Sequence, residues 1–129
     1  MIGYITLGTN NLVRAGEFYD ELLAEMGARR TMTDERMLGW GAPDGQAMFS
    51  VISPFDEEPA TVGNGVMIAL DVKTPEMVER LYQKALELGA ADEGDPHDRG
   101  SSMGFYGGYF RDLDGNKLVA YCLGYNPDD

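Results

Sequence analysis

The sequence predicts an α+β fold in which one unit, strand-helix-strand-strand-strand, occurs twice. The first observation is a pair of hairpin signals, Asp44-Gly45 and Asp114-Gly115, which each separate two apolar, aromatic-rich runs and lie 70 positions apart. Glycine accepts the positive φ that such turns require. The residues after each pair also correspond, Gln46 with Asn116. The second observation is an amphipathic helix pattern ahead of each hairpin, so the chain is expected to be built twice from one unit.

We expect the first unit to occupy residues 1–53. Residues 2–9 alternate in polarity, which is typical of a strand, and place Tyr4 and Thr6 on one face. Asn10 is expected to cap a helix through its side-chain oxygen, because apolar side chains then follow at three- and four-residue spacing. Three strands are expected after this helix, over residues 29–33, 36–41 and 47–53.

Residues 54–65 combine Pro, Gly, Asn and acidic side chains, which predicts a linker. The second unit is expected over residues 66–125. Thr74 is expected to cap its helix, with Pro75 at the first helical position, where the missing N–H costs nothing. The other expected elements are a strand over 66–72, a helix end near Leu88, a short strand near 90–93, a loop over 94–103, and strands over 104–112 and 117–123.

Composition and charge limit the class of partner. At 129 residues with 43% apolar content, the chain is most simply one globular domain. Its 22 acidic residues against 10 basic ones give a net charge of −12, which repels phosphate backbones and anionic lipid. Nucleic acid and membrane surfaces are therefore not expected partners. Cys122 is the only cysteine, no secretory signal pattern occurs, and no apolar run reaches the ~20 residues of a membrane span, so we expect a cytoplasmic protein.

Four stretches of the sequence are more specific than a periodic pattern of apolar residues. They are Thr6-Leu7-Gly8-Thr9-Asn10-Asn11-Leu12, Phe18-Tyr19 with Leu22-Leu23, Gly63-Asn64-Gly65, and Phe110-Arg111-Asp112-Leu113-Asp114-Gly115-Asn116-Lys117. In these stretches and in its repeated unit, the chain resembles the vicinal oxygen chelate superfamily of glyoxalases, bleomycin resistance proteins and extradiol dioxygenases. The resemblance covers essentially the whole chain. It implies that residues 1–129 form a single domain, in which the two units make a cup-shaped curved mixed sheet with the helices outside.

The resemblance also implies where a metal would be bound, because metal-dependent members hold a divalent ion with His or Glu from four strand positions. Matched one by one, those positions fall on Tyr4, Phe49, Met67 and Val119. None is a carboxylate or an imidazole, which divalent transition metals prefer as ligands. We therefore expect no metal ligands and no cofactor in this chain.

Without a metal, the expected lining of the cup is mostly apolar and aromatic. Such a lining suits a small apolar or aromatic molecule held by burial and one or two hydrogen bonds. Equally, these side chains could simply fill the cup. The expected ligand-binding residues are Tyr4, Thr6, Phe49, Val51, Met67, Asp71, Val119 and Tyr121.

Three functions follow from this sequence. The first is a metal-free binding protein of the bleomycin resistance kind. The second is a lyase or dioxygenase of the glyoxalase type that uses Tyr4, Asp71 or His97 as acid–base groups, although a surface-loop role for His97 is the simpler interpretation. The third is an interaction module whose dimer surface is its function. A homodimer is expected because open sheet edges need covering.

Overall fold

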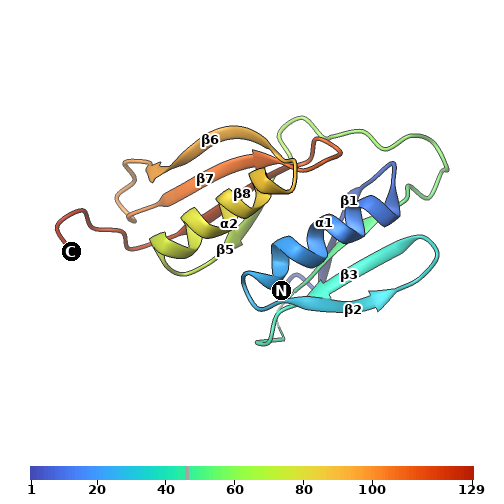
Figure 1. Ribbon diagram of the computed structural model, residues 1–129, viewed down its shortest axis with the longest axis horizontal. Coiled ribbons are helices and arrows are strands. Elements are labelled where there is room, and N and C mark those ends of the chain that lie inside the picture. Colours follow the sequence, from blue (N-terminus) through green and yellow to red (C-terminus); the bar gives the residue numbers. More distant parts are fainter. Residues whose placement is uncertain (46) are drawn as a thin grey trace. The chain divides into compact units, whose positions relative to one another are not determined.

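The computed structural model describes residues 1–45 and 47–129. It divides into two compact units, Met1–Asn64 and Gly65–Asp129. Each described unit consists of one helix and a four-stranded mixed sheet, in the order strand-helix-strand-strand-strand (Figure 1). The predicted α+β class and repeated unit are confirmed. The expected match of Gln46 with Asn116 lies outside the described residues.

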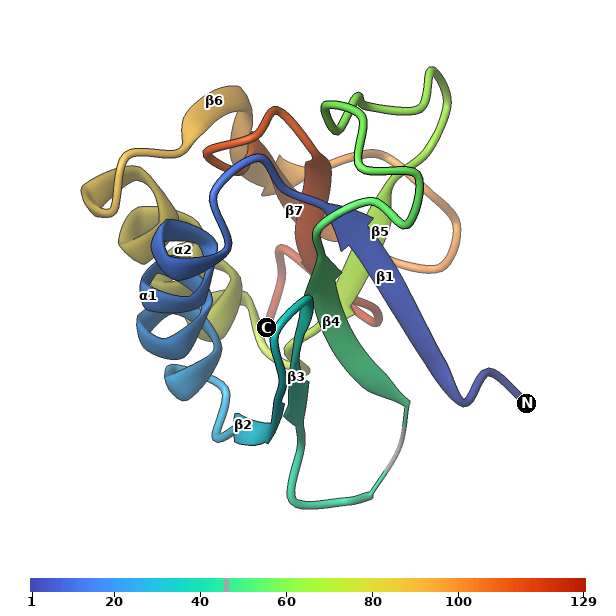
Figure 2. The same ribbon diagram turned by 90° about the vertical axis from the view of Figure 1, so that its right-hand side faces the viewer.

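The elements of unit 1 are β1 (Tyr4–Gly8), α1 (Leu12–Ala24), β2 (Arg29–Thr33), β3 (Met37–Gly41) and β4 (Met48–Ile52). The strands lie in the order β1-β4-β3-β2, with β1 parallel to β4 and the other neighbours antiparallel (Figure 2). Helix α1 packs against one face of this sheet. The opposite face carries no helix from the described residues of this unit.

Helix α1 begins one residue later than the sequence predicts. Asn11, not Asn10, is the N-cap, and its side-chain oxygen accepts a hydrogen bond from the Arg14 N–H. Asn10 has a different role, because its side-chain amide exchanges two hydrogen bonds with the backbone of Ala60. These bonds attach the expected linker segment to unit 1. The helix is followed by Gly27, whose φ of 81° satisfies the turn that ends it.

The core of unit 1 is an aromatic cluster between α1 and the sheet. The ring of Tyr19 lies 4.7 Å from that of Phe49 and 5.7 Å from that of Trp40, measured between centroids. Trp40 is buried, and its indole N–H donates to the Asp20 carboxylate at 2.9 Å. Burial of these three rings is a large apolar gain for this unit, because aromatic side chains bury a large area per residue.

The elements of unit 2 are β5 (Ile68–Asp71), α2 (Pro75–Glu87), β6 (Ala91–Asp98), β7 (Tyr106–Arg111) and β8 (Lys117–Cys122). The strands lie in the order β5-β8-β7-β6, with β5 parallel to β8, and α2 packs on one face (Figure 1). Thr74 caps α2 and Pro75 is its first residue, as predicted. Among the described residues, neither helix has the length and apolar content that crossing a bilayer requires.

Strand β6 corrects the prediction of a loop over residues 94–103. It continues to Asp98 because two register shifts let it stay paired with β7, through Gly94 opposite Tyr109 and His97 opposite Gly107. Gly94 has a φ of 141°, which a residue with a side chain rarely adopts. Since β6 is an edge strand, Pro96 is tolerated without its N–H. Gly, Pro and Asp in this run resemble a loop in sequence, which is why the strand was missed.

Candidate functional site

The open face of unit 2 is the sheet face opposite α2. Directly opposed residues of neighbouring strands lie on the same face. Gly108, which is opposite Ala120, lies against Tyr82 of α2, so this pair marks the helix side. The neighbouring pairs therefore lie on the open face, and they comprise Ala69, Asp71, Gly107, Tyr109, Val119 and Tyr121. By the same alternation Met67, just before β5, belongs to this face, so four expected ligand-binding residues share it: Met67, Asp71, Val119 and Tyr121.

The open face of unit 1 holds only two of its four expected ligand-binding residues. Tyr4 and Thr6 are opposite Met48 and Ser50, and these four residues define that face. Phe49 and Val51 are opposite Ile5 and Leu7 and lie on the α1 side, where Phe49 contacts the ring of Tyr19. The expectation that Phe49 and Val51 share a face with Tyr4 is therefore wrong.

The wrong face was predicted for Phe49 and Val51 because one turn is longer than its counterpart. Five residues, 112–116, separate β7 from β8, whereas six, 42–47, separate β3 from β4. A strand that is displaced by one residue turns every side chain to the other face. The repeat counted from the Asp-Gly pairs therefore matches Phe49 to Val119, but in the sheets the residue equivalent to Val119 is Ser50.

With this correction, the four positions that hold metal ligands in the resemblance are Tyr4, Ser50, Met67 and Val119. They offer a phenol, a hydroxyl, a thioether and an isopropyl group. The Ser50 hydroxyl is buried and donates to the carbonyl oxygen of Ile5. The described residues contain no group of three or more His, Cys, Asp or Glu side chains that could hold a metal ion. This donor set does not fit a divalent transition metal.

Aromatic side chains cover one end of the open face of unit 2. The ring of Phe105 stacks on that of Tyr121, with centroids 5.1 Å apart and planes within 5°. Phe105 lies over Gly107, where an added Cβ would be only 2.7 Å from the Phe105 ring and 3.2 Å from Val119. Val119 is fully buried. The sequence prediction missed Phe105, although Gly107-Gly108 in a strand is a signal of close approach by another group.

Basic side chains gather at the other end of the same face. Tyr109 contacts two of them: the Arg99 guanidinium carbon lies 4.9 Å from the ring centroid and the Lys117 amine 5.3 Å from it. Arg111, opposite Lys117 in the sheet, instead pairs with Glu93 at 2.5 Å. The open face of unit 2 therefore has an aromatic end and a cationic end, with Val119 between them.

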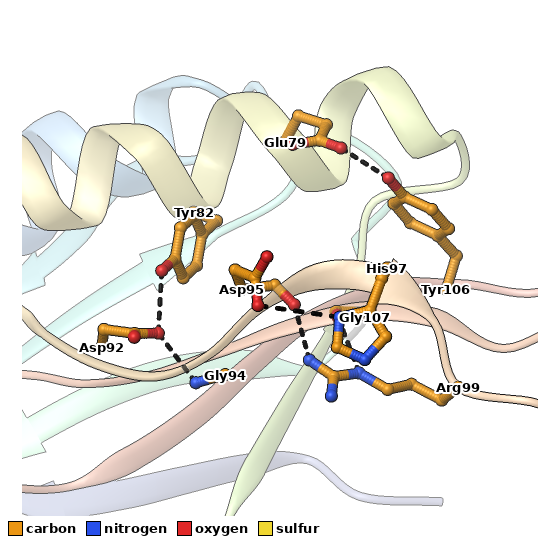
Figure 3. Close-up of polar contacts among 9 residues, drawn as sticks. All are labelled: Glu79, Tyr82, Asp92, Gly94, Asp95, His97, Arg99, Tyr106 and Gly107. Carbon is orange, nitrogen blue, oxygen red and sulfur yellow. Dashed lines mark hydrogen bonds and ion pairs between the residues drawn. The ribbon is translucent and has the colours of Figure 1, made fainter.

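His97 also lies on the open face of unit 2, at its β6 edge. It is opposite Gly107, and its Nδ1 is 3.7 Å from a carboxylate oxygen of Asp95 (Figure 3). About half of the His97 side chain is exposed, at 52%. The structure thus places His97 on a strand beside the expected site, whereas the sequence favoured a surface loop.

Two tyrosines on the helix side of unit 2 have strongly perturbed ionisation. Burial and a hydrogen bond to Asp92 raise the pKa of Tyr82 to about 12, and a hydrogen bond to Glu79 raises the pKa of Tyr106 to about 12 (Figure 3). The N–H of Gly94 and the Tyr82 hydroxyl hold the pKa of the Asp92 carboxyl below its usual range. These bonds connect α2 to the sheet, so we assign them to the fold and not to the site.

Unit 1 contains a cavity of about 430 Å³ that the sequence did not predict. It lies beside the segment that Asn10 attaches to the unit. The Arg36 guanidinium, which lines it, is 5.0 Å from the ring centroid of Phe55. The lining residues are Thr9, Asn10, Arg36, Ser53, Pro54, Glu57, Glu58 and Pro59. It includes none of the expected ligand-binding residues.

Residues 1–120 match the family model described as the Glyoxalase/Bleomycin resistance protein/Dioxygenase superfamily. The chain therefore belongs to this superfamily, as its sequence motifs predict. A solved glyoxalase/bleomycin resistance protein from Albidiferax ferrireducens is similar, at 28% identity and a TM-score of 0.86, over 95% of this chain and 98% of that one. A comparison with curated proteins found no match.

Two further solved structures have the same fold at lower identity. A glyoxalase/bleomycin resistance protein/dioxygenase family enzyme from Burkholderia phytofirmans is 16% identical, with a TM-score of 0.75, over 95% of this chain and 98% of that one. A lactoylglutathione lyase from Agrobacterium tumefaciens is 18% identical, with a TM-score of 0.68, over 94% of this chain and 92% of that one. At these identities the likeness concerns the fold alone.

Proposed function

We propose that this protein binds a small apolar or aromatic molecule on the open face of unit 2, without a metal ion. The observation that carries the proposal is the composition of that face. The half-buried rings of Tyr109 and of the stacked pair Phe105 and Tyr121 form an aromatic surface above the buried Val119. The polar groups Asp71 and His97 lie at its two edges. A largely apolar surface with a few polar groups at its rim is typical of small-molecule sites.

A thermal-shift screen with a library of small aromatic compounds tests this proposal. A compound that binds only the folded protein raises the unfolding midpoint. Hits are expected with EDTA present, and Ala69→Arg should abolish their effect because a long charged side chain would project over the face from an exposed position opposite Val119. The matched control is Val13→Arg on α1, where the side chain is 72% exposed. Equal loss of binding in both variants, or hits that need added metal, would contradict the proposal.

Restoring metal ligands tests the donor argument in the opposite direction. The variant that combines Met67→His with Val119→Glu should gain divalent-metal affinity, since it returns two of the donor types that such ions prefer to one face of the unit 2 sheet. The version with Leu118→Glu in place of Val119→Glu should not gain it, because Leu118 lies on the α2 side. Far-ultraviolet circular dichroism controls for folding. Stoichiometric metal in the unmodified protein, measured by elemental analysis, would contradict the metal-free function.

A second candidate function is a glyoxalase- or dioxygenase-type enzyme, a lyase or oxidoreductase, that uses other residues. The observation that favours it is His97 beside Asp95 at the edge of the open face, since a carboxylate can orient an imidazole for proton transfer. An imidazole that moves protons should be essential to turnover, so His97→Gln should abolish any activity found with a hit compound. Binding of the same compound should persist. Loss of binding together with activity would instead assign His97 to the binding surface.

The proposed partner of the protein is a second copy of itself, and the proposed location is the cytoplasm. In the two described sheets, β1 and β5 are edge strands, and unpaired strand edges favour pairing with another chain. Tyr4, at 59% exposure, lies on the β1 edge. Light scattering at micromolar concentration should give twice the 14.1 kDa chain mass. A mass equal to one chain would contradict the dimer.

A further inference from the structure

Building on the proposed function, we propose that the bound molecule is an organic anion, with a flat apolar body and a terminal carboxylate or similar group. Arg99 and Lys117 would hold the anionic group beside Tyr109, and the body would lie over the open face toward the ring of Tyr121. The inference concerns the charge of the ligand, whereas the proposed function concerns only where a ligand binds.

Arg99 is fixed in position by neutral groups. Its Nε donates to the carbonyl oxygen of Gly107 at 3.1 Å, and its NH2 group donates to the carbonyl oxygen of Asp95 at 2.7 Å (Figure 3). The guanidinium also lies on the ring of Tyr109 and against Gly94, where an added Cβ would be 3.1 Å from it. Two carbonyls and a ring orient the cation. Its charge also helps to lower the pKa of the Asp92 carboxyl, but Asp92 accepts its hydrogen bonds from Tyr82 and Gly94, so Arg99 is preorganised without a carboxylate in direct contact.

Lys117 approaches the same ring on the same face, from the neighbouring strand β8. Arg99 reaches Tyr109 across Gly94 of β6, whereas Lys117 projects from β8, diagonally across from Tyr109. Across the described residues, no carboxylate oxygen lies within 4.0 Å of either cation. In a chain with 22 acidic and 10 basic residues, two neighbouring cations without carboxylate partners are unexpected on composition alone.

The carboxylates on or beside this face already have partners of their own. Asp71 pairs with the Lys73 amine at 2.9 Å, and Glu93 pairs with Arg111 at 2.5 Å. The Asp95 carboxylate lies 3.7 Å from His97 Nδ1, and it is this residue's backbone carbonyl that Arg99 contacts. The Tyr109 end of the face therefore carries two cations with no carboxylate in direct contact, an arrangement that complements an anion.

The spacing of the two ends indicates the size of the molecule. Tyr109 and Gly107 are two residues apart on β7, as are Val119 and Tyr121 on β8. Two residues of an antiparallel strand span about 7 Å. An anionic group at Arg99 and Lys117 is thus separated from the stacked rings of Phe105 and Tyr121 by about the length of a bicyclic aromatic system.

A pair of probes that differ in charge and not in shape tests the inference. The probes are 2-naphthoate and its neutral isostere 2-naphthamide, titrated by isothermal calorimetry into the EDTA-treated protein. We expect the carboxylate to bind on the order of tenfold more tightly, because hydrogen bonds to charged groups are the strong ones. Lys117→Gln and Arg99→Gln should each reduce that preference, and Arg99→Lys should keep part of it.

Lys84→Gln is the matched control, since Lys84 lies on α2 and its removal changes the net charge by the same amount. It should leave the preference for 2-naphthoate unchanged. Three results would overturn the anion inference and leave the proposed function standing. The two probes could bind equally, Lys84→Gln could have the same effect as Lys117→Gln, or neutral library compounds could bind while 2-naphthoate does not. If no compound of the library binds, the proposed function fails as well, so failure of the anion inference alone and failure of both claims give different results.

Discussion

Replacing Phe49 by Ala tests the face to which the structure assigns this residue. Phe49 is buried on the α1 side of its sheet, with its ring centroid 4.7 Å from Tyr19 and 6.3 Å from Trp40. Truncating a buried Phe costs about 3–5 kcal/mol of folding free energy. Against the roughly 5–15 kcal/mol of stability typical of a folded protein, this loss is large. The variant should unfold at a much lower urea concentration.

The control is Tyr4→Ala, in the neighbouring strand on the opposite face. Because its side chain is 59% exposed, we expect its free energy of unfolding to change by no more than about 0.5–1 kcal/mol. Fluorescence of Trp40, the only tryptophan, reports unfolding of this unit in both variants. Equal destabilisation by the two substitutions, or a larger effect of Tyr4→Ala, would refute the assignment and restore Phe49 to the open face.

Two further predictions concern unit 2. Gly104→Ala should destabilise the folded protein far more than Gly100→Ala. Both positions have a positive φ, of 69° and 74°. An added Cβ at Gly104 would be 2.6 Å from the backbone of Tyr125, whereas at Gly100 it would have no neighbour within 4 Å. Similar urea midpoints for the two variants would contradict this. The second prediction concerns the pH dependence of stability. Folding raises the pKa of Tyr82 and Tyr106 from 10.0 to about 12. Their contribution to the free energy of unfolding is therefore complete below pH 10 and is lost as pH rises toward 12. The urea midpoint should fall over this range, and less steeply in Tyr82→Phe; an identical slope in that variant would count against it.

The sequence was sufficient to predict the repeated unit, because its signals are local. Asp-Gly turns, a Thr-Pro helix start and apolar spacing of three and four residues each depend on neighbours in the chain. Both helices and the predicted order of elements along the chain are confirmed. The local signal failed for β6, where register shifts at Gly94 allow a strand through a sequence that resembles a loop.

The candidate site was harder to predict, because its face assignments depend on loop length and on contacts distant in sequence. Alternation gave the correct face for Val119 and Tyr121, where the turn is five residues long, and the wrong face for Phe49, where it is six. The positions of Phe105 and Arg99 follow from side chains that fold back over glycines, Gly107 and Gly94. No periodic pattern encodes such a contact.

The central claim is that the open face of unit 2 binds a small molecule without a metal ion. The most direct measurement is a titration of ¹⁵N-labelled protein with a hit from the library screen, in EDTA, followed by amide chemical shifts. The account predicts that the largest shifts occur at Gly107, Val119 and Tyr121, while α2 stays unchanged. Shifts confined to α2, or shifts that appear only after a divalent metal is added, would contradict it.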